Sequence, residues 1–267
     1  MKGVFWGERP VDAVVFDLGG TLIDISKPIQ AVEKAFIEIA QELIDRGYDP
    51  VPGATRLQSA IGEDVDAIFA QREADGEQTE VNHADVLRDA YSSLGLQLDD
   101  ETLHKVMEIE QRAWWSGVSL AEGAIETLVT LRSRGVALGV CSNAPYHPPL
   151  TRKLLDQLGV AGLVDSIVLS AEVGYRKPSP KMFAAAAAGL ACDPPRMVFV
   201  GDRAREDVEG AKATGMLTAM VTKADPLSKD HIADAIVNRL TEIPELFSPA
   251  PAGGMATTQL EKWGAQI

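Results

Sequence analysis

The sequence predicts an α/β protein with a Rossmann-like parallel sheet core, helices on both faces of the sheet and an inserted α-helical cap domain. Short apolar runs recur along the chain with turn residues at both ends, and helical patterns separate the later runs. One long, more polar stretch shows helical spacing without a convincing strand. Strands that alternate with helices form parallel sheets, and functional residues lie at the carboxyl ends of such strands.

Five apolar runs are expected to form the strands of this sheet. They are DAVVF from residue 12, VALGVC from 136, SIVLS from 166, MVFVG from 197 and TAMVT from 218. The helices expected between the later runs are LTRKLLDQLG, with Leu150, Leu154 and Leu158 on one face, then KMFAAAAAGL, and then EDVEGAKATG, which ends at a glycine cap.

The chain divides into a core, a cap and a tail. Residues 1–25 and 120–247 are expected to form the core, and residues 26–119 the cap. The first cap helix is marked by Ser26 and Pro28 at its start, by apolar residues at helical spacing from Val32 to Leu43, and by Gly47 beyond its end. Residues 248–267 are rich in Pro, Gly, Ala and Thr, so we expect a flexible tail there.

Composition and charge exclude several classes of protein. The net charge of −14 disfavours binding to nucleic acid or to an anionic membrane surface, and any phosphate site must carry its own positive compensation. Cys141 and Cys192 are too few for a disulfide framework or a four-ligand zinc site, and no signal peptide precedes the core. We therefore expect a cytoplasmic protein with neither a nucleic-acid nor a membrane partner, and the oligomeric state stays open.

Carboxylates follow two of the predicted strands. Asp17 ends the first strand, next to Gly19 and Gly20, where the backbone can approach a ligand closely. A carboxylate can attack phosphorus if a divalent cation offsets the repulsion between the two anions, and that cation needs a second carboxylate. Asp202 ends a later strand and Asp207 follows at a helix start, and such hard oxygen ligands select Mg²⁺.

Two further segments carry groups that suit a phosphate. Ser142 and Asn143 follow the strand from residue 136, and a hydroxyl with exposed N–H groups can hold phosphate oxygens. Lys177, in GYRKPSP, can act as a point charge. Each segment alone is also compatible with an ordinary turn, a helix start or a solvated lysine. Because they end successive strands in one order, we interpret them as one site.

These motifs resemble those of the haloacid dehalogenase superfamily. FDLGGTL resembles the first motif of that superfamily, CSN the second, RKPSP the third and GDRAREDVEGA the fourth, over roughly residues 11–25 and 120–246. The resemblance implies a magnesium-dependent phosphatase that hydrolyses a phosphorylated small metabolite. A helical cap after the first motif would close over the site and exclude water.

The resemblance implies a role for each motif residue. Asp17 would form an aspartyl-phosphate. Asp17, Asp202 and the backbone carbonyl of Gly19 would bind Mg²⁺, and Asp207 would support the ion through water or an indirect contact. The phosphoryl group would be held by Ser142 and Lys177, with Thr21 and the amides of Gly20 and Asn143 nearby.

Gly19 departs from the superfamily pattern, because most of its phosphatases have an acid–base aspartate at this position. Losing such a group costs roughly 10²–10⁴ in rate. Substitutes from the cap or the motifs are His83, Glu63, Asp64 and Arg205, each more readily explained as solvated surface. Otherwise the substrate has a leaving group acidic enough to depart unassisted, as in an acyl phosphate or a sugar 1-phosphate.

The residue at position 19 also bears on three other functions. A phospholigand-binding protein with weak or no turnover is favoured by Gly19 and opposed by the presence of Asp17. Dehalogenases of the superfamily have tyrosine at this position, which disfavours carbon–halogen cleavage. Phosphonoacetaldehyde hydrolases lack the acid but need a lysine in the cap, and here Lys27, Lys34 and Lys105 lie only near the ends of the insert.

The sequence does not identify the substrate, because specificity would lie in the cap. Trp114 and Trp115 stand near the return of the cap to the core. We expect this pair to serve packing at the domain junction, with a role in lining a pocket as the alternative.

Overall fold

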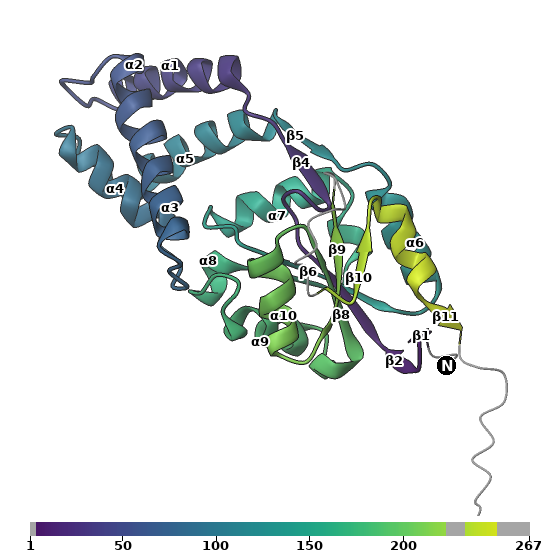
Figure 1. Cartoon of the computed structure of the whole chain (residues 1–267). Coiled ribbons are helices and arrows are strands. Elements are labelled where there is room, and N and C mark those ends of the chain that lie inside the picture. Colours follow the sequence, from purple (N-terminus) through teal and green to yellow (C-terminus); the bar gives the residue numbers. More distant parts are fainter. Residues whose placement is uncertain (1–3, 223–232, 250–267) are drawn as a thin grey trace, which may run out of the picture.

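The computed structural model describes residues 4–222 and 233–249, apart from the side chains at positions 63, 64, 66 and 73. It shows a parallel sheet with helices on both faces and a helical cap beside one end of the strands (Figure 1). This arrangement confirms the predicted fold class. None of the helices in the described ranges is long and apolar enough to cross a membrane.

The main sheet has six parallel strands in the order β10-β9-β8-β3-β6-β7. The strands are β3 (Ala13–Phe16), β6 (Ala137–Ser142), β7 (Ser166–Leu169), β8 (Met197–Gly201), β9 (Leu217–Val221) and β10 (Ala235–Val237). The first five are the predicted runs, to within one or two residues. Strand β10 was not predicted, because three residues between polar segments give too short a pattern to detect.

Helices cover both faces of this sheet. Side chains of a strand alternate between its two faces. Val14 and Phe16 of β3 therefore pack with Leu128 of α6 (Ala124–Ser133), whereas Val15 packs with Phe183 of α9 (Pro180–Gly189) on the opposite face. The remaining helical elements of the core are α7 (Pro148–Gln157), α8 (Ser170–Val173), α10 (Gly210–Ala213), η2 (Ala161–Leu163), η3 (Pro194–Arg196), η4 (Ala204–Glu209) and η5 (Leu240–Leu246).

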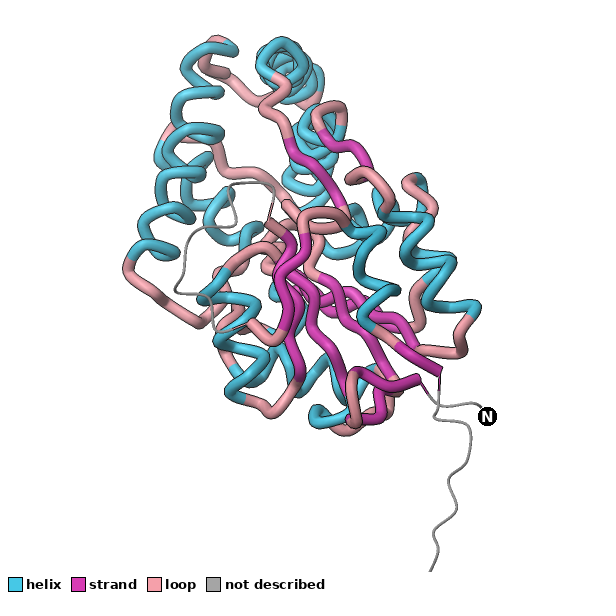
Figure 2. Tube along the Cα trace, turned by 45° about the vertical axis from the view of Figure 1, so that its right-hand side comes forward, coloured by secondary structure: helices cyan, strands magenta, loops and turns pink. Residues whose placement is uncertain are grey.

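The cap lies between β4 (Ile23–Ile25) and β5 (Val118–Leu120), which pair antiparallel. Its elements are α1 (Ile29–Asp45), α2 (Ala54–Leu57), η1 (Gln58–Glu63), α3 (Asp64–Ala74), α4 (His83–Ser93) and α5 (Asp100–Trp115). They enclose an apolar core of their own, which includes the predicted face of α1 from Val32 to Leu43. Figure 2 shows these helices gathered above one end of the magenta strands.

A small antiparallel sheet closes the far end of the core. It consists of β1 (Val4–Trp6), β2 (Arg9–Val11) and β11 (Ser248–Pro249), in the order β11-β1-β2. Ser248 and Pro249 were predicted to begin a flexible tail, but the structure pairs them with Phe5 and Val4. The rest of that tail, residues 250–267, lies outside the described residues.

Candidate active site

The carboxyl ends of three neighbouring strands bring the predicted motifs together. Strands β8, β3 and β6 are adjacent in the sheet. Asp17 follows β3, Asp202 follows β8, and Ser142 ends β6. Because parallel strands end at the same edge, residues more than a hundred positions apart in the sequence meet in one place.

Lys177 is the centre of this site. Its Nζ lies 2.6 Å from Oδ1 of Asp17 and 2.6 Å from Oδ1 of Asp207. The three residues are only 4%, 6% and 1% exposed, respectively. A buried ammonium group between two carboxylates avoids the large cost of leaving any of these charges unpaired.

Asp207 is held on both of its oxygens. Oδ1 accepts a hydrogen bond from Nζ of Lys177, and Oδ2 accepts hydrogen bonds from the backbone N–H groups of Asp202 at 3.1 Å and Arg203 at 3.0 Å. Gly201 permits this close approach, because a Cβ atom there would lie 2.3 Å from Oδ2 of Asp207. Asp207 thereby fixes the loop that presents Asp202.

Burial and neighbouring charges shift the pKa values in the site. Burial, and then repulsion by Asp207, raise the pKa of Asp17 to about 6 against the attraction of Lys177. Burial alone would lower the pKa of Lys177, but attraction to Asp17 and Asp207 outweighs burial and raises it. Burial and the charge of Asp207 also raise the pKa of Asp202. The raised pKa values of Asp17 and Asp202 mean that a nearby cation would stabilise the charged forms of these two groups.

The carboxylates fit a divalent cation. Asp17, Asp202 and Asp207 each offer an oxygen, and these atoms lie within 4.8 Å of one another. Three carboxylates and one ammonium group leave a formal charge of −2, which a divalent cation would balance. Hard oxygen donors of this kind suit Mg²⁺.

Glycine lets the loop after β3 approach Asp202. Gly20 has a φ of +84°, and a Cβ atom there would lie 2.3 Å from Oδ2 of Asp202. Any side chain at position 20 would therefore displace this carboxylate. Gly19 lines the adjacent cavity, but the role of its carbonyl stays a prediction.

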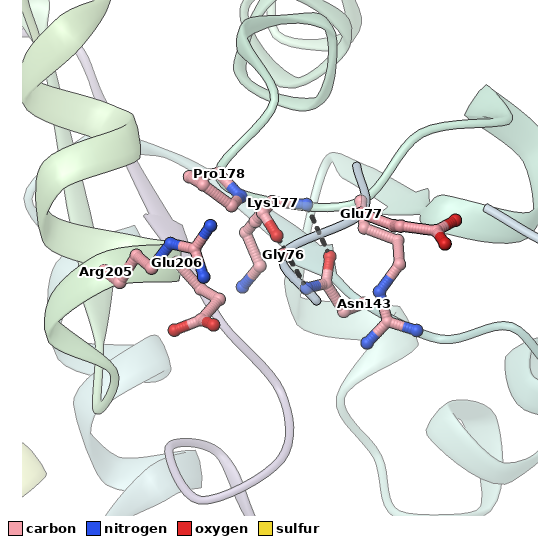
Figure 3. A pocket seen from close by; sticks show the side chains of 8 residues that line it. Gly76, Glu77, Asn143, Lys177, Pro178, Arg205 and Glu206 are labelled. Atoms are coloured by element: carbon pink, nitrogen blue, oxygen red, sulfur yellow. Dashed lines mark hydrogen bonds between the residues drawn. The ribbon is translucent and has the colours of Figure 1, made fainter. Parts of the chain in front are cut away.

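The second and third motifs are joined by hydrogen bonds. The backbone N–H of Lys177 donates to Oδ1 of Asn143 at 2.7 Å, and Nδ2 of Asn143 donates to the carbonyl of Lys177 at 3.1 Å (Figure 3). Ser142, which is 5% exposed, lies beside Asn143 on the cavity wall. The side chain of Asn143 therefore positions Lys177, in addition to any contact that its amide makes.

Thr21 takes a different place from the one predicted. Its side chain is fully buried, and its hydroxyl lies 3.5 Å from Oδ1 of Asp202, to which it donates. It is not among the described residues that line the cavity. Thr21 therefore supports Asp202 from the protein interior and not from the cavity. The tight turn after Gly20 directs the side chain of Thr21 inwards.

A cavity of about 600 Å³ lies over the carboxylates, between core and cap. The core contributes Asp17, Ser142 and Lys177, among others, and the cap contributes its own side chains from α3, α4 and α5. Trp114 and Trp115 both line it, and Trp114 also packs against the cap core. The tryptophan pair therefore serves packing and the cavity wall together, where the sequence favoured packing alone.

The loop between α3 and α4 docks the cap onto the segment before Lys177. The N–H of Arg176 donates to the carbonyl of Gln78 at 2.7 Å, and the N–H of Glu80 donates to the carbonyl of Gly174 at 3.0 Å. The buried side chains of Arg176 and Glu80 form an ion pair at 3.6 Å. The sequence analysis did not predict this ion pair. Its only local signal is the basic residue that precedes Lys177 in RKPSP.

The four candidates for a substitute acid–base group, each of which was expected to lie on the solvated surface, have different positions. His83 lines the cavity. Arg205 lies instead at a narrow recess beside it, shared with Glu206 and with Gly76 of the cap loop (Figure 3). The side chains of Glu63 and Asp64 lie outside the described residues.

His83 stands in an aromatic wall of the cavity. Its ring centroid lies 5.7 Å from that of Phe69 in the cap and 5.5 Å from that of Tyr146 in the core. Its Nδ1 is buried and has no hydrogen-bond partner among the described atoms. Burial, and then the charge of His147, lower the pKa of His83 to about 4, so its imidazole is neutral at pH 7.

Comparison with known proteins gives the family. The sequence matches the profile of haloacid dehalogenase-like hydrolases over residues 11–215. Phosphoglycolate phosphatase of Neisseria meningitidis is 31% identical over 90% of this chain and 94% of its own length. Glyceraldehyde 3-phosphate phosphatase of Methanopyrus kandleri is 33% identical, but the match spans only 45% of this chain and 52% of that protein. The crystal structure of a 2-haloacid dehalogenase from Pseudomonas syringae matches 88% of this chain with a TM-score of 0.64 at 22% identity, and covers 97% of its own chain.

The parallel sheet and the charged site at its strand ends define an α/β protein of the Rossmann-like class. Within that class, the chain belongs to the haloacid dehalogenase-like hydrolase family, as its four motifs indicated. The dehalogenase structure is similar in fold alone, so the chemistry must be argued from the site.

The low pKa of His83 leads to a prediction about acid stability. Between its ordinary pKa of 6.5 and about 4, the unfolded chain binds a proton at His83 that the folded chain does not bind. The free energy of unfolding should therefore fall as the pH drops through this range, and His83 should account for up to about 3 kcal/mol of the loss. Urea unfolding in the presence of a chelator, at neutral pH and near pH 4, measures it. His83→Gln should remove this part of the pH dependence, and coincident pH profiles for the two proteins would contradict the prediction.

Proposed function

We propose that this chain is a magnesium-dependent phosphatase that hydrolyses a phosphorylated small metabolite through an aspartyl-phosphate on Asp17. One observation carries the proposal: Lys177 lies 2.6 Å from Asp17 and from Asp207 at the base of the cavity between core and cap. This arrangement gives a buried nucleophile, a fixed positive charge beside it and room for a substrate. Relatives named as phosphatases of phosphoglycolate and of glyceraldehyde 3-phosphate support the same class of reaction.

The first step follows from the position of Asp17. An oxygen of Asp17 bonds to phosphorus while the bond between phosphorus and the leaving oxygen breaks, and the electron pair stays on that oxygen. Lys177 compensates the charge of the phosphoryl oxygens, and Ser142 and the amide of Asn143 donate hydrogen bonds to them. A bound Mg²⁺ would be held by Asp17, Asp202 and the carbonyl of Gly19. Its positive charge would offset the repulsion between the carboxylate of Asp17 and the phosphoryl group.

Asp207 has an indirect role in this proposal. Both of its oxygens already accept hydrogen bonds from groups of the protein itself. It therefore supports the ion by holding Asp202 and Lys177 in place. Thr21 acts in the same way through its hydrogen bond to Asp202.

The second step is hydrolysis of the aspartyl-phosphate. Water adds to phosphorus, inorganic phosphate leaves, and the carboxylate of Asp17 is restored. Position 19, where most phosphatases of the superfamily have an acid–base aspartate, is glycine, so this chain has no carboxylate there to activate the water. We infer that the second step is slow. In the extreme case, this protein would bind phospholigands with little turnover.

We propose no nucleic-acid or membrane partner for this chain. Both cysteines are free thiols, which is compatible with the reducing cytoplasm that we propose as its location. The net charge of −14 leaves the compensation of substrate charge to Lys177, the amides and the metal.

Activity should require Asp17 and Mg²⁺ together. Asp17→Asn removes the nucleophile but keeps the size of the side chain, so phosphate release from p-nitrophenyl phosphate and acetyl phosphate should fall to background. Chelation of Mg²⁺ should have the same effect on the parent. Asp156→Asn, which changes an exposed aspartate of α7, is the matched control and should leave the rate unchanged. Phosphate release that survives Asp17→Asn would overturn the proposal.

Restoring the acid at position 19 should accelerate the reaction with poor leaving groups. Gly19 does not have a positive φ, and an added Cβ would lie 3.3 Å from Cδ1 of Ile25, which is 60% exposed and can move aside. Gly19→Asp should therefore fit and raise kcat/KM, which reports the first step, by about 100-fold for alkyl phosphates, with little change in kcat/KM for acetyl phosphate. Gly19→Asn, which adds the same bulk without an acid, should give no such gain. Equal rates for the Asp and Asn variants would show that position 19 does not limit turnover.

A further inference from the structure

We propose that the substrate of this phosphatase is an aryl phosphate monoester with a bulky, uncharged leaving group. This inference rests on the proposed function and deepens it by naming the substrate class. Three properties of the cavity over Asp17 support it: the apolar surface of its cap side, the charges around it and the lack of an acid at position 19.

The size and lining of the cavity suit an aromatic ring system. Its volume of about 600 Å³ is in the range that holds whole drug-sized ligands, and a phosphoryl group fills only a small part of it. On the cap side the wall is formed by apolar side chains, including those of Ile61, Val65, Phe69, Met107 and Trp114.

An aromatic cluster forms part of the same wall. The rings of Phe69, His83 and Tyr146 follow one another at centroid distances of 5.7 and 5.5 Å, and all three residues line the cavity. Aromatic pairs favour such offset or edge-to-face contacts. A flat ligand ring can join this cluster, and the neutral imidazole of His83 adds no charge that would attract an anion.

The charges of the cavity disfavour a second anionic group on the substrate. Besides the carboxylates of the metal site, Glu206 lines it. The lining cations are already engaged: Arg176 pairs with Glu80, and Arg203 also has a partner. A carboxylate or second phosphate would therefore meet like charge, unlike the ring of an aryl ester.

The glycine at position 19 gives an independent reason to expect an aryl ester. Gly19 has no side chain, and the nearest atom to an added Cβ would be the methyl Cδ1 of Ile25. The leaving oxygen must then depart as an anion that is stable without protonation, and an aryloxide meets this condition. Asp17 bonds to phosphorus, the bond from phosphorus to the aryl oxygen breaks, and the aryloxide later takes a proton from water.

The substrate preference of the parent protein tests this inference. We would measure kcat/KM with Mg²⁺ for 1-naphthyl phosphate, phenyl phosphate, acetyl phosphate and phosphoglycolate. The first two leaving groups have similar basicity but different apolar area, so 1-naphthyl phosphate should exceed phenyl phosphate by about tenfold or more. Both should exceed phosphoglycolate.

Two neighbouring residues of α3 provide matched variants. Phe69→Ala should bring the ratio of naphthyl to phenyl phosphate close to one, and Phe69→Leu, which keeps more of the packing, should lower it in part. Ile68→Ala changes a side chain that is 45% exposed and lies outside the described cavity wall, so the ratio should stay unchanged.

The possible failures are distinguishable. Asp17-dependent cleavage of acetyl phosphate or phosphoglycolate, with no preference for naphthyl over phenyl phosphate, would overturn the aryl ester and leave the phosphatase intact. The absence of Asp17-dependent phosphate release from all four compounds would overturn the phosphatase, and the aryl ester with it.

Discussion

The buried contact of Lys177 with Asp17 and Asp207 is the interaction on which the site depends. It joins the end of β3 to the loop after α8 and to η4, and all three residues are nearly inaccessible to solvent. Removing one partner of such a group leaves an uncompensated buried charge, at a cost of about 3–5 kcal/mol. The parallel sheet is the scaffold that makes the contact possible, since it brings strand ends together from distant parts of the chain.

Much of this arrangement could be predicted from the sequence, because it is local. A buried parallel strand is a short apolar run, and the residue that follows it must lie at the sheet edge. Asp17, Ser142 and Asp202 were located in this way, and the structure places them at the ends of neighbouring strands. The first helix of the cap, α1, could also be predicted, because its apolar residues recur at helical spacing.

The rest depends on contacts between distant residues that no local pattern records. The ion pair of Arg176 with Glu80 and the ring contacts of His83 exist only when cap and core meet. Strand β11 needs β1 as a partner, so Ser248 and Pro249 looked like the start of a tail. Thr21 was expected to contact substrate, but whether a side chain after Gly20 turns inwards depends on the φ of that glycine.

The most direct test of the account is to trap the aspartyl-phosphate. Because Gly19 leaves the hydrolysis step unassisted, the intermediate should accumulate when the protein is mixed with acetyl phosphate and Mg²⁺ and then quenched with acid within one turnover. Peptide mapping by mass spectrometry should find one phosphoryl group on the peptide that contains Asp17, and none in the Asp17→Asn protein. Continued release of phosphate with no phosphoryl group on that peptide would contradict the central claim that Asp17 is the nucleophile.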